Sequence, residues 1–250
     1  MPPLIRCFRL LILLCALCTS AVHAANIVTL AKGGFTLTYD CDNRATTRYE
    51  YVLTTDTGSV ARPSSFYLDP DLPTGCNGQF TNASYASVVT GWDRGHLVTS
   101  NHMDYSATYI KRANYMTNIL PQVATFNQGI WLKAENVAEC YRDLATVHVY
   151  GGVVFNDTSN DYFTSSHGVK TPDWWWKTII TTDTTTGATK AISWYIPNSG
   201  SLGTLDSYIV SISELESLVG ADDIGISATP AVKAMKPSAT WALPSGCDLS

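Results

Sequence analysis

Charged residues are scarce in this sequence, and basic ones are scarcer than acidic ones. Only 15% of the 250 residues are charged, with 16 Lys and Arg against 21 Asp and Glu, for a formal net charge of −5 at pH 7. A net acidic chain lacks the basic surface expected of a tight nucleic-acid binder. It does not exclude an enzyme whose few cations converge on one cleft. Affinity for a long polyanion would then be weak and sensitive to salt.

Long apolar runs are absent after the N-terminal segment. The run at residues 10–17 follows Arg6 and Arg9, is too short to span a bilayer, and is followed by small residues at 21–24. This pattern predicts a secretory signal peptide at residues 1–24, with a membrane anchor as the weaker alternative, and a single domain at residues 25–250. The leader holds two of the 16 basic residues and no acidic one, so the mature chain would carry 14 against 21, a formal charge of −7.

Cysteine is sparse beyond this leader. The Cys15-Ala-Leu-Cys18 pair has the spacing of a redox motif but lies inside the apolar run, so it carries no redox prediction. The cysteines that remain after the predicted cleavage are Cys41, Cys76, Cys140 and Cys247. An even number in an exported chain predicts two disulfides, for which three connectivities are open. We take Cys41–Cys76 and Cys140–Cys247 as the working pairing, and the spacings are too wide for a zinc site.

Internal repeats, low-complexity tracts and linkers are also absent, as are the Gly-x-Ser-x-Gly motif of a serine esterase and the Cys/His ligand set of a zinc deaminase. Residues rich in β-branched and aromatic side chains predict strands at 27–39, 48–55, 145–155, 174–182 and 191–196. Helices are predicted at 106–116, 127–141 and 211–219, and a loop at 63–87. Strands before and after central helices favour an α+β fold, with a largely antiparallel central sheet flanked by helices.

The motif Asp93-Arg94-Gly95-His96 is the first of two that group reactive side chains. A neutral imidazole can take a proton from water near pH 7, and a guanidinium offers a planar fork of donors that matches phosphate oxygens. The other four histidines lie in the leader or outside any recognisable cluster. His96 is therefore the candidate general base, with Arg94 as a candidate phosphate ligand.

The second motif spans residues 117–135 and contains Asn127 and Glu135. An amide oxygen can bind a hard divalent ion, and magnesium often keeps several waters and few protein ligands. Eight residues separate Asn127 from Glu135, about 12 Å along an unbroken helix, so direct joint coordination is not expected. A contact through metal-bound water, or a helix that begins after Asn127, fits better. Taken alone, Asn-Gln-Gly is more often a turn and Glu135 a solvated face.

Together these motifs supply a base, a cation for phosphate, a metal ligand and a carboxylate, the set that phosphodiester hydrolysis requires. They resemble the sugar-non-specific DNA/RNA endonuclease family, the group of Serratia nuclease and mitochondrial endonuclease G. The family signature is Asp-Arg-Gly-His, then Thr/Ser-Asn-Ile-x-Pro-Gln, then Asn-Gln-Gly-x-Trp and Glu. This chain carries those motifs in the same order and spacing at residues 93–96, 117–122, 127–131 and 135. Softer matches at 61–63, 150–153 and 196–198 extend the resemblance over most of the mature chain.

The resemblance implies a ββα-metal active-site motif on a mixed sheet with helices on both faces. It also implies that His96 is the general base, that Asn127 is the direct ligand of a hydrated magnesium ion, and that Glu135 positions metal-bound waters. Arg94 and Arg62 would stabilise phosphate charge. Manganese or another divalent ion is the alternative metal.

The resemblance further implies that Asn118 braces the site or the transition state and that Asp93 orients its neighbours. The implied activity is hydrolysis of DNA and RNA by a secreted enzyme, with 5′-phosphate products. A catalytically inactive nucleic-acid-binding member of the same fold is the alternative function, since the chain is acidic and residues 97–104 depart from the Pro/Ala-rich stretch of many relatives.

Three further features of the sequence allow more than one interpretation. His102, close to the first motif, is expected to be structural. The run Trp174-Trp175-Trp176 offers indoles on which bases could stack, but alternation along a strand favours core packing. The triplets at 82–84 and 156–158 match the N-glycosylation sequon, which matters only in a eukaryotic host.

Overall fold

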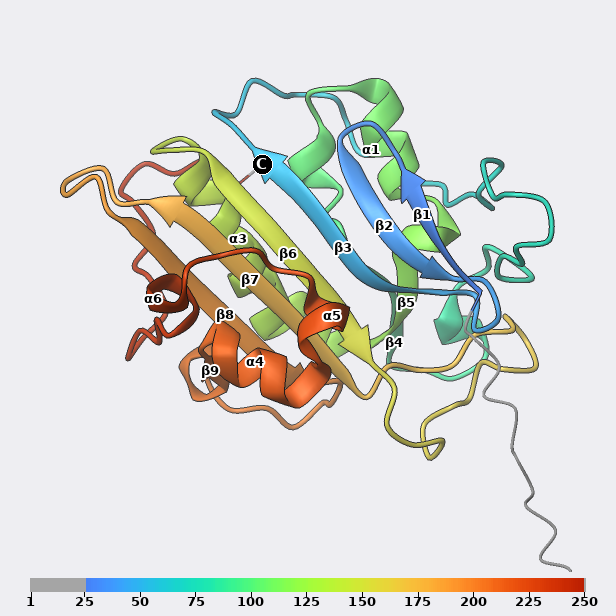
Figure 1. Ribbon diagram of the computed structural model, residues 1–250. Coiled ribbons are helices and arrows are strands. Elements are labelled where there is room, and N and C mark those ends of the chain that lie inside the picture. The colour runs from blue at the N-terminus through green and yellow to red at the C-terminus, as the bar shows by residue number, and fades with distance from the viewer. Residues whose placement is uncertain (1–25, 250) are drawn as a thin grey trace, which may run out of the picture.

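The centre of the protein is a seven-stranded sheet in the order β1-β2-β3-β6-β7-β8-β9 (Figure 1). The computed structural model describes residues 26–249, so the predicted leader lies outside the described residues. The strands are β1 (Ile27–Ala31), β2 (Phe35–Asp40), β3 (Ala45–Leu53), β6 (Val147–Val154), β7 (Trp174–Thr182), β8 (Thr189–Pro197) and β9 (Ile209–Val210). Every neighbouring pair in this sheet is antiparallel. The predicted antiparallel sheet is therefore confirmed, and the mixed sheet implied by the resemblance is wrong for the described strands.

Helices cover both faces of the sheet (Figure 1). On one face lie α1 (Ala107–Ala113) and α3 (Leu132–Arg142), which pack on the larger apolar core. On the other face, α4 (Ile212–Val219) and α6 (Pro230–Lys233) pack on β8, and α5 (Ala221–Ile224) packs on β3 and β6, around a second, smaller core. No helix within residues 26–249 combines the length and the apolar run that crossing a bilayer requires.

The two faces explain the tryptophan run. Trp175 and Trp176 are both fully buried, Trp175 in the core under α3 and Trp176 in the core under α4. Trp174 is half-buried and stacks on Tyr195 of the neighbouring strand, with 4.5 Å between ring centroids. The alternation of a strand thus places these indoles in packing contacts, as the sequence predicted.

A separate two-stranded sheet carries the first motif. Strand β4 (Trp92–His96) pairs antiparallel with β5 (Ile119–Val123), and the chain then continues through α2 (Ala124–Phe126) and the π-helical turn η4 (Asn127–Trp131) into α3. Two strands followed by a helix form the ββα unit. Gly95 is required for close packing here, because a Cβ at this position would lie 2.3 Å from the Gln122 side-chain oxygen.

Short 3₁₀ turns complete the connections: η1 (Tyr85–Ser87), η2 (Asn101–Met103), η3 (Met116–Asn118) and η5 (Leu205–Tyr208). The working disulfide pairing is confirmed. Cys41 bonds Cys76, and Cys140 bonds Cys247, with Cα–Cα distances of 4.8 and 5.2 Å. The first disulfide fastens the 63–87 loop to the end of β2. The second fastens the C-terminal segment to α3.

Candidate active site

A cavity of about 480 Å³ lies between the end of β4 and the start of α3. Its wall is formed by Arg62, His96, Thr99, Ser100, Asn101, Asn127, Gln128, Leu132, Glu135 and Leu249. Of the six residues predicted to form the site, Arg62, His96, Asn127 and Glu135 line it. Arg94 and Asn118 do not.

His96 is held in one tautomer by Asn114. The imidazole Nε2 lies 2.9 Å from Asn114 Oδ1, while Asn114 Nδ2 donates to the carbonyl oxygens of Pro63 and Ser65 at 2.9 and 3.1 Å. Carbonyl oxygens only accept, so the amide nitrogen must face them and the amide oxygen must face His96. Nε2 therefore carries the hydrogen, and Nδ1 keeps the lone pair that a general base needs.

Arg62 supports the same assignment. Its Nη2 lies 3.5 Å from His96 Nδ1, and because a guanidinium can only donate, Nδ1 is the acceptor. Burial, followed by the charge of Arg62, lowers the pKa of His96 to about 3; Asn114 opposes the shift and Arg94 adds to it. The imidazole is therefore neutral at pH 7.

Arg94 lies near this imidazole and contacts the same phenylalanine ring. Its guanidinium lies over the Phe66 ring, 3.7 Å from the centroid, and Nη1 donates to the Asn82 carbonyl at 2.8 Å. The Phe66 ring also packs against His96, with 5.6 Å between ring centroids. Phe66 thus supports both the predicted base and the predicted phosphate-binding cation.

Asp93 orients Asn127. Its Oδ2 accepts from Asn127 Nδ2 at 2.9 Å and from Gln128 Nε2 at 2.8 Å. A carboxylate only accepts, so the amide nitrogen of Asn127 faces Asp93 and its oxygen is left for another partner. The helix predicted at 127–141 begins later: Gly129, at φ −104° and ψ −107°, interrupts the helical path, and regular helix begins at Leu132. The alternative, a helix that begins after Asn127, is confirmed.

Glu135 occupies the first turn of α3 and is only 8% exposed. Thr99 Oγ1 donates to its Oε1 at 2.6 Å, and the Lys177 ammonium lies 3.7 Å from the same oxygen. Burial lowers the pKa of Lys177 to about 8, and Glu135 opposes that shift. Lys177 therefore remains mostly charged at pH 7.

Asn118 is fully buried and bonded only to backbone. Its Oδ1 accepts from Val98 N at 2.9 Å, and its Nδ2 donates to the carbonyls of Val98 and Ala113 at 2.9 and 2.8 Å. It links the segment after His96 to the segment before Asn114. Of the two roles considered for it, bracing fits this geometry.

The residues after His96 depart from the family pattern, yet two of their hydroxyl groups make hydrogen bonds with residues of the site. Thr99 donates to Glu135, and Ser100 Oγ lies 3.3 Å from Asn114 Oδ1. His102 is 1% exposed and bonds Tyr51 and Glu139, which agrees with its predicted structural role. Sequence alone does not reveal Asn114, Thr99 or Ser100, because none belongs to a motif and each matters only through its tertiary contacts.

The donor set fits a hydrated hard cation better than a zinc ion. Within residues 26–249 no group of three or more His, Cys, Asp and Glu side chains is placed to hold a metal. Zinc sites take three or four such ligands. One oriented amide oxygen with a carboxylate nearby suits a magnesium ion that keeps most of its waters.

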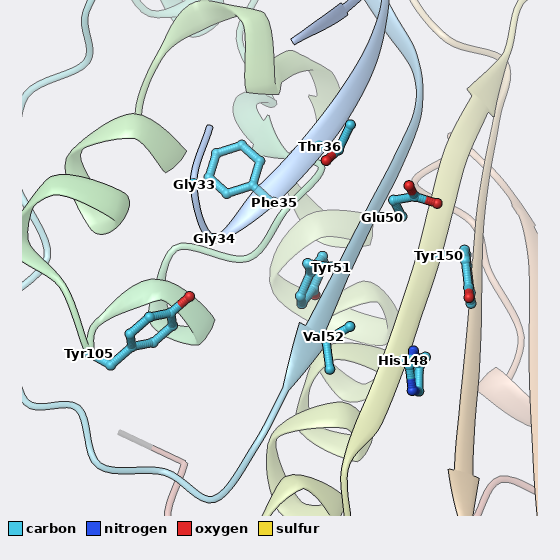
Figure 2. A pocket seen from close by; sticks show the side chains of 10 residues that line it. All are labelled: Gly33, Gly34, Phe35, Thr36, Glu50, Tyr51, Val52, Tyr105, His148 and Tyr150. Atoms are coloured by element: carbon cyan, nitrogen blue, oxygen red, sulfur yellow. The ribbon is translucent and has the colours of Figure 1, made fainter. Parts of the chain in front are cut away.

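A second cavity, of about 510 Å³, lies on the opposite face of the sheet over β2, β3 and β6 (Figure 2). Its wall includes Tyr105, Tyr150, His148 and Glu50 but no lysine or arginine. With a carboxylate and no fixed cation, this cavity lacks the groups that bind phosphate. The smaller cavity beside His96 is therefore the candidate site.

Known proteins are similar to this chain in sequence and in fold. The profile of the DNA/RNA non-specific endonuclease family matches residues 19–233. A nuclease of Nostoc sp. is 29% identical over 178 residues, 66% of this chain and 61% of the relative. A nuclease of Serratia marcescens is 25% identical over 152 residues, 57% of this chain and 56% of the relative. The chain thus spans about three fifths of the length of these curated relatives.

A structural comparison gives the same grouping. A chain of the crystal structure of the EndoG/EndoGI complex superposes with a TM-score of 0.61 at 19% identity, covering 76% of this chain and 82% of that one. At this identity the likeness shows the fold alone. Since the family profile covers most of the sequence and the fold agrees, the chain belongs to the DNA/RNA non-specific endonuclease family.

Proposed function

We propose that this protein is a secreted, metal-dependent endonuclease that hydrolyses the phosphodiester bonds of DNA and RNA. Residues 25–250 would form its one nuclease domain after removal of residues 1–24. The observation that carries the proposal is the wall of one cavity, which holds an imidazole of fixed tautomer, a guanidinium, an oriented amide oxygen and a carboxylate.

His96 is the general base in this proposal. Its Nδ1 takes the proton from the attacking water, while Asn114 keeps the ring oriented and accepts from Nε2. Arg62, at the cavity wall, binds a non-bridging phosphate oxygen and stabilises the charge that grows on the phosphorus centre. Arg94 adds positive potential from behind Phe66.

Asn127 and Glu135 would hold magnesium or manganese. Asn127 would contribute its amide oxygen directly, and Glu135 would accept hydrogen bonds from the ion's water ligands. When bound, the ion supplies positive charge at the leaving oxygen. Asn118 braces the backbone between the two strands of the unit.

Lack of sequence preference follows from such a site. Arginines and a metal ion that contact only phosphate carry no base information. No step uses the 2′-hydroxyl, so RNA and DNA both serve as substrates. Export is supported by the two disulfides, which form and persist in oxidising compartments.

The test is digestion of supercoiled plasmid and of RNA by the mature protein, with magnesium, with EDTA, and with His96→Ala in parallel. Cleavage of both polymers that is lost with EDTA and with the variant is expected. Intact substrates in the presence of a folded, metal-loaded protein would refute the proposal. Retention of both polymers without cleavage would then favour the inactive binding member of the same fold.

A further inference from the structure

Lys177 is a buried lysine in the middle of the central sheet, with its ammonium group directed toward the candidate site. It is fully buried on β7, between Gly151 of β6 and Trp194 of β8. Burying a charge is strongly unfavourable unless a counter-charge accompanies it. Among residues 26–249, Glu135 is the carboxylate within ion-pair distance of Lys177, 3.7 Å from Nζ to Oε1.

The surroundings of the ammonium group leave it little freedom. The Trp131 ring lies beneath it, 4.4 Å from Nζ to the centroid, and Trp131 itself is fully buried. Lys177 has no other ion-pair partner in the described part of the chain. The ammonium has no hydrogen-bond partner among the described residues, so its charge is stabilised by the cation–π contact with Trp131 and by the Glu135 carboxylate.

The same contact constrains Glu135. Its Oε1 faces two donors from segments far apart in sequence, Thr99 after β4 and Lys177 on β7. No described side chain bonds its Oε2, while Glu135 lines the cavity beside Asn127. The two donors on Oε1 thus orient a carboxylate that borders the cavity.

We propose that Lys177 is a positioning residue that holds the Glu135 carboxylate in the orientation required to bind the hydrated metal ion. The inference rests on the proposed function and adds to it a group outside the cavity wall. Partners of this kind behind metal-site ligands change metal affinity or activity by about 10- to 100-fold when they are removed. Lys177 acts through Glu135 and touches no substrate.

A buried ion pair can also serve stability alone, and Lys32 offers the matched control. Lys32 is 1% exposed and pairs with Asp69 at 2.7 Å, in the turn between β1 and β2 and outside the cavity wall. Lys32→Met and Lys177→Met each remove a buried ammonium and keep an unbranched apolar side chain. Only the second change would disturb the metal site.

The experiment is a double-mutant cycle with Lys177→Met, Glu135→Gln and both together, beside Lys32→Met. Three quantities are measured: Mn²⁺ affinity by titration calorimetry, kcat and KM on plasmid DNA, and Tm in EDTA. Lys177→Met is expected to lower Mn²⁺ affinity or kcat by about 10- to 100-fold, with KM changed by less than about twofold. In the Glu135→Gln background the same substitution should have no further effect on either quantity.

The Tm values should show a different pattern, in which the second substitution partly compensates for the first. Glu135→Gln leaves the Lys177 charge without a carboxylate and lowers Tm, and adding Lys177→Met restores part of that loss. Lys32→Met lowers Tm without changing Mn²⁺ affinity or kcat. An equal loss from Lys177→Met in both backgrounds would overturn the inference. So would a lower Tm with unchanged Mn²⁺ affinity and kcat, as in the control.

The two proposals fail in different ways. Wild-type protein that binds Mn²⁺ but cuts neither polymer refutes the proposed function, while the Mn²⁺ and Tm arms of the cycle still decide the role of Lys177. Wild-type protein that cuts both polymers, with additive effects in the cycle, refutes the role of Lys177 alone.

Discussion

Stability below neutral pH should report the protonation state of His96. The pKa of His96 in the fold is about 3, against 6.5 when unperturbed, so the folded state binds fewer protons than the unfolded state between these values. The free energy of unfolding must then fall as pH drops below 6.5, by about 1.4 kcal/mol per unit. At pH 5, 1.5 units below 6.5, His96 alone lowers it by about 2 kcal/mol.

His96→Gln isolates this contribution. Glutamine cannot titrate, and its amide can still donate to Asn114 Oδ1, so the variant retains the bond that orients the ring in the wild type. Urea unfolding in EDTA, at pH 7 and pH 5 and one ionic strength, gives the free energies. Wild type should lose about 2 kcal/mol more than the variant between the two pH values. A difference below about 0.5 kcal/mol would show that the buried imidazole accepts a proton in place, and would refute the account of a base held neutral.

Four other outcomes are expected. Asn114→Ala frees the tautomer and should lower kcat by roughly 100-fold with little change in KM, and an unchanged kcat would exclude its orienting role. Asn127→Ala should raise the Mg²⁺ concentration needed for half-maximal cleavage, against an unchanged requirement if Asn127 is no ligand. Cleavage of both DNA and RNA should weaken as salt rises, and RNA left intact while duplex DNA is cut would contradict phosphate-only recognition. The Cys41–Cys76 and Cys140–Cys247 disulfides close separations of 35 and 107 residues. Replacing both cysteines by serine should therefore lower the free energy of unfolding by about 4 kcal/mol for the first disulfide and by about 5 kcal/mol for the second. Reduced protein with an unchanged Tm would rule this out.

The sheet was predictable where strands are long and rich in β-branched and aromatic residues. The strand at 174–182 coincides with β7, and the segment 27–39 is the β1–β2 hairpin, turned at Gly33 with φ +87°. Strands β4 and β5 were not predicted. Each has five residues, and together they contain Asp, Arg, Gly, His, Pro and Gln, which have little preference for a strand. They pair because the chain between them folds back, which no local pattern reveals.

In the candidate site, only the residues that belong to the sequence motifs could be predicted. The motifs, together with the family resemblance that they carry, pointed to His96, Asn127 and Glu135, and all three line one cavity. Asn114 is 18 residues from its partner His96, and Thr99 is 36 residues from its partner Glu135, so only the fold brings them together. The disulfide pairing was one of three that the sequence allowed. Only the fold selects this pairing, because it places Cys247 beside α3.

The chain as a whole is acidic, whereas the region around His96 carries positive charge. The two arginines near His96 have two effects there. In the proposed function Arg62 and Arg94 stabilise phosphate charge, and burial together with their charges keeps His96 unprotonated. A bound phosphodiester carries a negative charge that offsets those cations, so the imidazole should become a stronger base when substrate binds. One charge at about 5–6 Å in an effective dielectric of about 20 is worth about 3 kcal/mol, or roughly 2 pKa units.

The acidic limb of kcat should therefore lie at higher pH than that of kcat/KM. The profile of kcat/KM reports free enzyme, in which the pKa of His96 is about 3, and the profile of kcat reports the substrate complex. Initial rates at saturating and limiting plasmid, over the pH range in which the protein stays folded, separate the two. Replacing Arg62 by Gln should move both limbs upward, since it removes the larger of the two charge effects on the imidazole. If the kcat limb lay at or below that of kcat/KM, substrate phosphate would not approach Nδ1 closely enough for His96 to be the base.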